Sequence, residues 1–101
     1  LLGWDLDADG SLLPLLWADV GGTIVMEGKE VFRRAVRLMV DSAQKAMANA
    51  GVTGDDISLL VPHQANIRII QAACDRLGVP IERAESEIIY FFLGSNRIGA
   101  V

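Results

Sequence analysis

The sequence has few of the residues that build the commonest sites in small proteins. Its 101 residues include one cysteine, Cys74, and one histidine, His63. A lone cysteine excludes an internal disulfide and a cysteine-rich zinc site, and it fits a reducing compartment such as the cytoplasm. No apolar run is long enough to span a bilayer. The acidic start also lacks the basic stretch of a signal peptide. We therefore expect a cytoplasmic globular chain with no membrane partner.

Basic residues are also scarce, at 9 Lys and Arg against 13 Asp and Glu, which gives a net charge of −4. Without a basic stripe, nucleic acid is not an expected partner. Hydrophobic residues make up 51% of the chain, which favours a packed core over disorder. The length suits one small domain. The first residue is Leu1 rather than methionine, so we expect this chain to be processed or part of a longer one.

Apolar spacing predicts two helices. Over residues 30–50, apolar side chains recur every four residues, and Gly51 is placed to end the helix. That stripe consists of Val31, Ala35, Met39, Ala43 and Met47, broadened by Val36, Val40 and Ala50. Asn66 is a natural N-cap for a second helix over residues 66–77, which ends at Gly78. Its predicted apolar face carries Ile67, Ile70, Cys74 and Leu77.

Two apolar runs predict strands: residues 57–61, expected to be a buried strand, and residues 88–93. The order helix, strand, helix, strand indicates an α/β fold with a parallel pairing across the second helix. A polar stretch over residues 82–87 is expected to form a helical turn between that helix and the last strand.

The first part of the chain is less regular. Residues 1–11 have the Asp and Gly content of a turn-forming loop, and residues 12–17 predict a short strand interrupted by Pro14. Residues 19–23 predict a turn. Asp5, Asp7 and Asp9 alternate as in an EF-hand loop, but Leu16 stands where the closing glutamate is required. We expect an acidic turn there and no metal.

His63 is the main candidate for chemistry, because it follows the strand at 57–61 and precedes the helix that Asn66 begins. In open α/β folds, ligands bind at the carboxyl ends of strands. A neutral imidazole there can donate to a substrate oxygen or accept from one. Taken alone, such a histidine is also compatible with a structural role in a loop.

The segment Val61-Pro62-His63-Gln64-Ala65-Asn66 resembles the histidine motif of the β-ketoacyl-acyl-carrier-protein synthase III family. Similar resemblance extends over residues 3–11, 26–36 and 50–83. It implies that residues 1–101 are a single partial domain from the C-terminal lobe of a thiolase-like fold. From residue 84 the sequence departs from the family pattern, which leaves a divergent tail over residues 84–101.

The resemblance also implies an activity, the decarboxylating condensation of acyl-CoA with malonyl-acyl carrier protein that starts fatty acid synthesis. It implies no cofactor and no metal, and a homodimer for the parent enzyme. An enolate oxygen develops during decarboxylation, and neutral donors stabilise it. His63 would be one donor. The family's nucleophilic cysteine lies outside this segment, so we expect the segment alone to be inactive. Cys74 is three helical turns from the motif, which favours a structural thiol.

Two further residues match family positions, and a third resembles one. The resemblance places Asn66 near the pantetheine arm and Arg68 on the surface where the acidic carrier protein docks. Without it, Asn66 is an N-cap and Arg68 a solvated charge. Asn96, in Gly94-Ser95-Asn96, matches the family's catalytic asparagine motif only loosely and is otherwise a turn residue.

Two other hypotheses remain open at this stage. The chain could be an inactive, truncated remnant that serves as a binding or assembly module. It could also belong to a related thiolase-superfamily member with different acyl chemistry. The position of Asn96 relative to His63 distinguishes the enzymatic hypothesis from the remnant.

Overall fold

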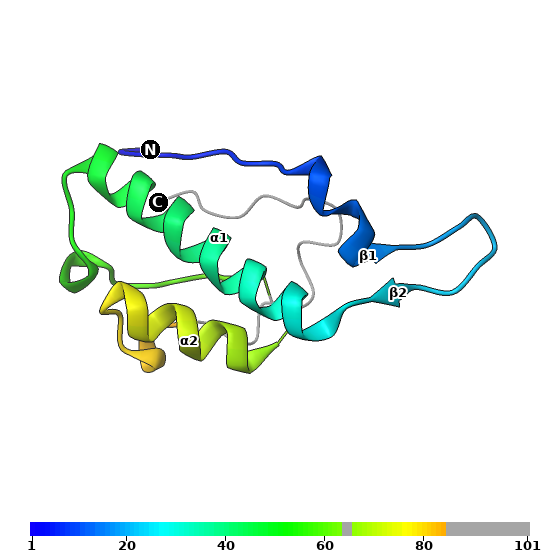
Figure 1. The fold of residues 1–101 in the computed structure, drawn as a ribbon. Helices are drawn as coiled ribbons and strands as arrows, with labels where there is room; N and C mark the ends of the chain where they lie inside the picture. The colour runs from blue at the N-terminus through cyan, green and yellow to red at the C-terminus, as the bar shows by residue number, and fades with distance from the viewer. Residues whose placement is uncertain (64–65, 85–101) are drawn as a thin grey trace.

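The computed structural model describes residues 1–63 and 66–84, and two packed helices form its centre (Figure 1). Helix α1 spans Gly28–Ala50 and helix α2 spans Ile67–Leu77. A small antiparallel sheet pairs β1, Leu16–Trp17, with β2, Val25–Met26. Three short 3-10 helices complete the described part: η1 over Gly10–Leu15, η2 over Gly54–Asp56 and η3 over Ile81–Arg83.

Both predicted helices are confirmed, together with the residues that end them. Helix α1 begins two residues earlier than predicted and ends at Gly51, which has a φ of 71°. Helix α2 begins after Asn66, whose side chain accepts from the Arg68 backbone N–H, and ends at Gly78 with a φ of 68°. Glycine adopts this left-handed conformation without the steric penalty of a Cβ atom.

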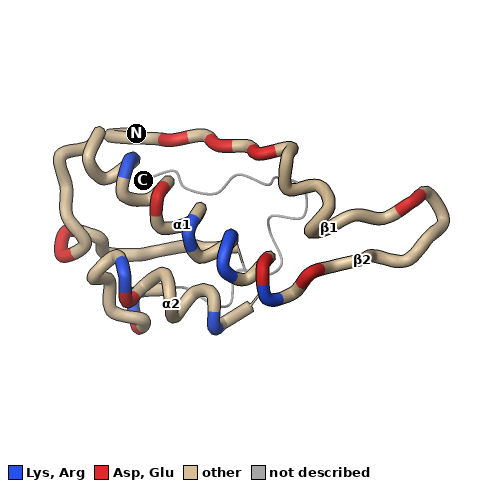
Figure 2. The backbone as a smooth tube through the Cα atoms, viewed as in Figure 1, with Lys and Arg blue, Asp and Glu red and all other residues tan. Residues whose placement is uncertain are grey.

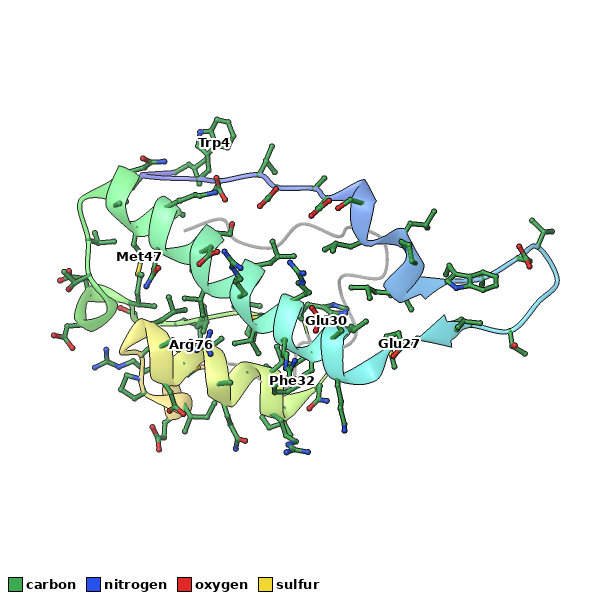
Figure 3. The ribbon with its side chains drawn as sticks, in the orientation of Figure 1. Trp4, Glu27, Glu30, Phe32, Met47 and Arg76 are labelled. Atoms are coloured by element: carbon green, nitrogen blue, oxygen red, sulfur yellow. The ribbon has the colours of Figure 1, made fainter. Side chains whose placement is uncertain are left out.

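The core lies between α1 and α2. Its buried apolar residues are Val36, Met39, Val40, Met47, Ile57, Ala73, Leu77 and Val79. Figure 3 shows Phe32 of α1 directed toward the beginning of α2, and Phe32 packs on the edge of this core. One predicted core position is wrong, because Ile67 is 52% exposed. It is the first residue of α2, so no preceding turn of that helix covers its side chain.

The predicted strand over residues 57–61 is reduced to a single parallel bridge between Leu60 and Ala84. The Leu60 N–H donates to the Arg83 carbonyl at 2.8 Å. The bridge is parallel, as predicted for a pairing across α2, but the predicted partner strand at residues 88–93 lies outside the described residues. Burial was predicted wrongly here, since Leu59 and Val61 are 56% and 52% exposed. A strand is buried on both faces only when further layers cover it, and within residues 1–63 and 66–84 only one face is packed.

The lead-in also differs from its prediction. Residues 12–15, expected as strand, belong to η1, because Asp9 caps that turn by accepting from the Ser11 N–H at 3.0 Å. Only Leu16–Trp17 is extended, and it forms a hairpin with β2 that projects away from the helices (Figure 1). The predicted turn at its tip is present, with the Gly22 N–H donating to the Asp19 carbonyl at 2.9 Å.

Residues 1–9, expected as a loop, instead run extended beside α1 (Figure 1). Gly3 permits this close approach, because a Cβ atom there would lie 2.2 Å from the Ala46 carbonyl oxygen. Figure 2 shows the aspartates in a row along this segment, and one of them reaches α1, where Lys45 Nζ lies 3.8 Å from Asp5 Oδ2.

The remaining predictions fall at the end of the chain. The helical turn predicted over residues 82–87 begins one residue earlier, as η3, which extends only to Arg83. Residues 85–87 and the strand predicted over residues 88–93 lie outside the described residues. In the part of the chain that the structure describes, no helix is long and apolar enough to cross a membrane.

Candidate active site

His63 lies at an open groove with a volume of about 290 Å³ and almost wholly apolar walls. The groove is formed where η1 and β1 meet the first half of α1, with one residue from α2. Its apolar lining is Leu12, Leu15, Leu16, Val31, Ala35, Leu38, Met39 and Ile69. His63 and Arg34 are the two polar side chains of the lining. The walls suit an aliphatic ligand, and the imidazole supplies a hydrogen-bonding group at its border.

The His63 side chain is exposed and forms no hydrogen bond with any residue in ranges 1–63 and 66–84. In sequence, His63 lies between the bridge at Leu60 and Asn66, the N-cap of α2. Both ring nitrogens are therefore open to a ligand in the groove. A neutral imidazole can donate from one nitrogen and accept at the other.

Asn66 and Arg68 lie at the beginning of α2, close to His63 in the chain. Asn66 Oδ1 accepts from the Arg68 N–H at 2.9 Å, which leaves the Asn66 amide NH₂ as a further donor. Arg68 is exposed. Neither residue lines the groove, so the structure brings only His63 of this predicted set to its wall. Asn96 lies outside the described residues.

Cys74 is separate from the groove. It is 1% exposed, and burial, together with the nearby Asp75 carboxylate, raises the pKa of its thiol. A raised pKa lowers the fraction of nucleophilic thiolate. Burial of Cys74 on the packed face of α2 fits the predicted structural role of this thiol.

The aspartates of residues 5–9 serve local structure. Hydrogen bonds from the Ser11 hydroxyl and N–H to Asp9 lower the pKa of that carboxyl. Asp5 faces Lys45. Across residues 1–63 and 66–84, no three acidic, histidine or cysteine side chains are grouped so that they could hold a metal ion.

The groove itself was not predicted. The apolar stripe of α1 predicts a helix with one packed face, yet Val31 and Ala35 are only partly buried and line the groove. Arg34 lies off that stripe, so the apolar spacing alone contains no signal of the groove.

Comparison with known proteins agrees with the fold. Residues 47–89 match the family model for the C-terminal part of 3-oxoacyl-[acyl-carrier-protein] synthase III. The β-ketoacyl-[acyl-carrier-protein] synthase III 2 of Deinococcus radiodurans is 56% identical over 70 residues, covering 69% of this chain and 21% of that protein. The synthase III of Rhodobacter capsulatus is 44% identical over 90 residues, covering 82% of this chain and 28% of the relative.

Solved structures give the same result. The 3-oxoacyl-(acyl carrier protein) synthase III of Pseudomonas aeruginosa superposes with a TM-score of 0.78 at 40% identity, over 83% of this chain and 27% of its own. The 3-oxoacyl-[acyl-carrier-protein] synthase III of Aquifex aeolicus superposes with a TM-score of 0.78 at 43% identity, covering 82% of this chain and 27% of that structure.

The fold is thus a partial α/β unit of the thiolase-like condensing-enzyme class. More specifically, the chain corresponds to a C-terminal segment of the β-ketoacyl-acyl-carrier-protein synthase III family. It spans less than a third of the length of the relatives it matches, 21% and 28% of the two described above. These matches do not favour an inactive remnant.

Proposed function

We propose that this chain contributes His63 to a decarboxylating acyl condensation in which acyl-CoA and malonyl-acyl carrier protein are the substrates. One observation carries the proposal: the histidine of the family motif lies at the wall of an apolar groove and has no hydrogen-bond partner among the described residues. Names of the relatives support the acyl-carrier chemistry. Residues 1–101 would then be a single partial domain of the C-terminal lobe, with the divergent tail at 84–101.

In this proposal the malonyl group loses its carboxyl as carbon dioxide. The electron pair of the broken C–C bond passes into an enolate, whose oxygen takes negative charge. A His63 N–H donates to that oxygen, and such a donor is most effective where apolar walls keep water out. The enolate carbon then attacks an acyl thioester held on a cysteine outside this segment, and the thiolate leaves.

Other residues would assist the same reaction. Asn66 can position the pantetheine arm with its amide NH₂, and Arg68 can bind a carboxylate of the carrier protein because it is exposed in the first turn of α2. Asn96 is proposed as the second oxyanion donor. The proposal includes a homodimeric parent enzyme and a cytoplasmic location, the latter because Cys74 is an unpaired thiol.

A chimeric enzyme tests the proposal. Residues 1–101 replace the matching segment of the Pseudomonas aeruginosa synthase III, and malonyl decarboxylation is measured alongside condensation. We expect activity in the chimera and a loss of roughly 10²–10³-fold in His63→Ala, the usual effect of removing one oxyanion donor. Arg37→Gln, on the exposed face of α1, is the matched control and should leave the rate unchanged. Equal activity in His63→Ala and the unaltered chimera would refute the role of His63.

A further inference from the structure

Among the residues that the structure describes, Arg34 is the one Lys or Arg side chain that lines the groove beside His63. Its neighbours in the lining are aliphatic, and Val31, Ala35 and Leu38 flank it on α1. The Arg34 side chain is 45% exposed, so its guanidinium stays in contact with solvent at the border of the groove while its stem can pack on the apolar wall. Arg34 therefore places a positive charge next to an aliphatic surface.

Glu30 orients this guanidinium. Its Oε1 accepts from Arg34 Nε at 2.9 Å, while its Oε2 lies 3.7 Å from Arg33 Nη1. Figure 3 labels Glu30 on the first turns of α1, the end of the helix that η1 and β1 approach. One carboxylate is thereby shared by two arginines, so the three side chains together keep a net positive charge.

The two Nη groups of Arg34 have no hydrogen-bond partner in the part of the chain that the structure describes. Asp9 is the other carboxylate close enough to act on Arg34, since the guanidinium contributes to the lowered pKa of Asp9. However, Asp9 Oδ1 already accepts from the N–H and the hydroxyl of Ser11. The guanidinium therefore has donors available for a ligand.

These observations define the ligand by its chemistry. A guanidinium binds a carboxylate through two parallel hydrogen bonds, and the leucine-rich walls take an aliphatic chain. The volume of about 290 Å³ lies at the lower end of the range for small-molecule sites. We propose that Arg34 is a specificity-determining residue that selects, in the groove beside His63, aliphatic ligands carrying a carboxylate. A role of Arg34 in substrate selection rests on the proposed condensation. Binding of a carboxylate ligand in the groove can be measured without turnover.

Binding of octanoate and of 1-octanol to the 101-residue chain tests this proposal. The two probes share an aliphatic chain and differ in charge, and isothermal titration calorimetry at low salt gives both affinities. We expect octanoate to bind about tenfold more tightly than 1-octanol, the size of one good charge-assisted interaction at a partly exposed site. In Arg34→Gln that preference should disappear, with 1-octanol binding unchanged.

Arg37→Gln is the control, because Arg37 lies one turn further along α1, pairs with Asp41 at 3.5 Å and does not line the groove. It should keep the full preference for octanoate. Equal affinity for the two probes, absence of binding, or an equal loss in both variants would each overturn the proposal. A failed binding test leaves condensation by the chimera untouched, and an inactive chimera leaves the binding result untouched, so the two proposals fail separately.

Discussion

Gly54 is a position where the structure predicts a sharp effect of a single added methyl group. It begins η2 and lies against the last turn of α2, so that a Cβ atom would be 2.3 Å from the Leu77 carbonyl oxygen and 3.2 Å from the Gly78 carbonyl. The first distance is about an ångström short of ordinary contact, which begins at 3.4 Å. Both partners are backbone, so neither can rotate away.

We therefore expect Gly54→Ala to destabilise the fold by about 1–3 kcal/mol, the usual cost of inserting a methylene into a packed site. Each kcal/mol lowers the Tm of a chain of this size by roughly 4–8 °C. Urea and thermal unfolding, followed by far-UV circular dichroism, measure both quantities. η2 precedes the segment that leads to His63, so octanoate binding should weaken in the same variant.

Gly28→Ala provides the matched control. Gly28 is the first residue of α1, and a Cβ atom there meets nothing within 4 Å. The same Gly-to-Ala change should raise stability slightly, by about 0.4–1 kcal/mol, because it reduces the conformational entropy of the unfolded chain. If Gly54→Ala were as stable as Gly28→Ala, the close packing of η2 on α2 would be refuted.

Three further predictions concern contacts around the same turn and the core. Arg83 Nη1 donates to the Asp55 and Ile57 carbonyls at 3.2 and 3.1 Å, so Arg83→Gln should cost about 1–2 kcal/mol in urea unfolding; an unchanged midpoint would contradict these bonds. Hydrogen bonds from the Thr53 N–H and hydroxyl lower the pKa of Asp56 in the folded chain. The stability this gives is present above the ordinary carboxyl pKa of 3.8 and is lost as pH falls through the lower folded value, so Asp56→Asn should flatten the fall in Tm below about pH 4. The buried Cys74 thiol, whose pKa is raised, should react slowly with a thiol reagent in the folded chain and rapidly in urea; fast labelling without urea would contradict its burial.

Local signals explain what could be predicted. Gly51 and Gly78 end their helices in the left-handed conformation, and Asn66 caps α2, because these effects depend only on neighbouring residues. Elements that depend on distant parts of the chain were predicted less well. Whether Leu59 and Val61 are buried depends on which layers cover the segment, and a run of apolar residues contains no information about them.

In the candidate site, too, the residue identified from a local motif was predicted, whereas the groove formed by distant parts of the chain was not. His63 could be chosen from its motif, since six consecutive residues carry the resemblance, but the groove depends on η1 and β1 packing near α1 from about twenty residues away in sequence. The expected strand at Leu12 became a 3-10 turn through the Asp9 cap, and that turn brings Leu12 and Leu15 to the groove wall.

The stripe of α1 is the feature that joins fold and site. From Val36 to Met47 the buried residues of α1 form the core with α2, whereas Val31 and Ala35 remain partly exposed at the groove, and Met39 contributes to both. A helix with a uniform apolar stripe is normally covered along its whole length, because leaving aliphatic surface in water costs about 25 cal/mol per Å². The uncovered half lies next to His63 and carries Arg34 within it. Helix α1 therefore stabilises the fold with one end and shapes the ligand groove with the other, which is why substitutions at its two ends should separate stability from binding.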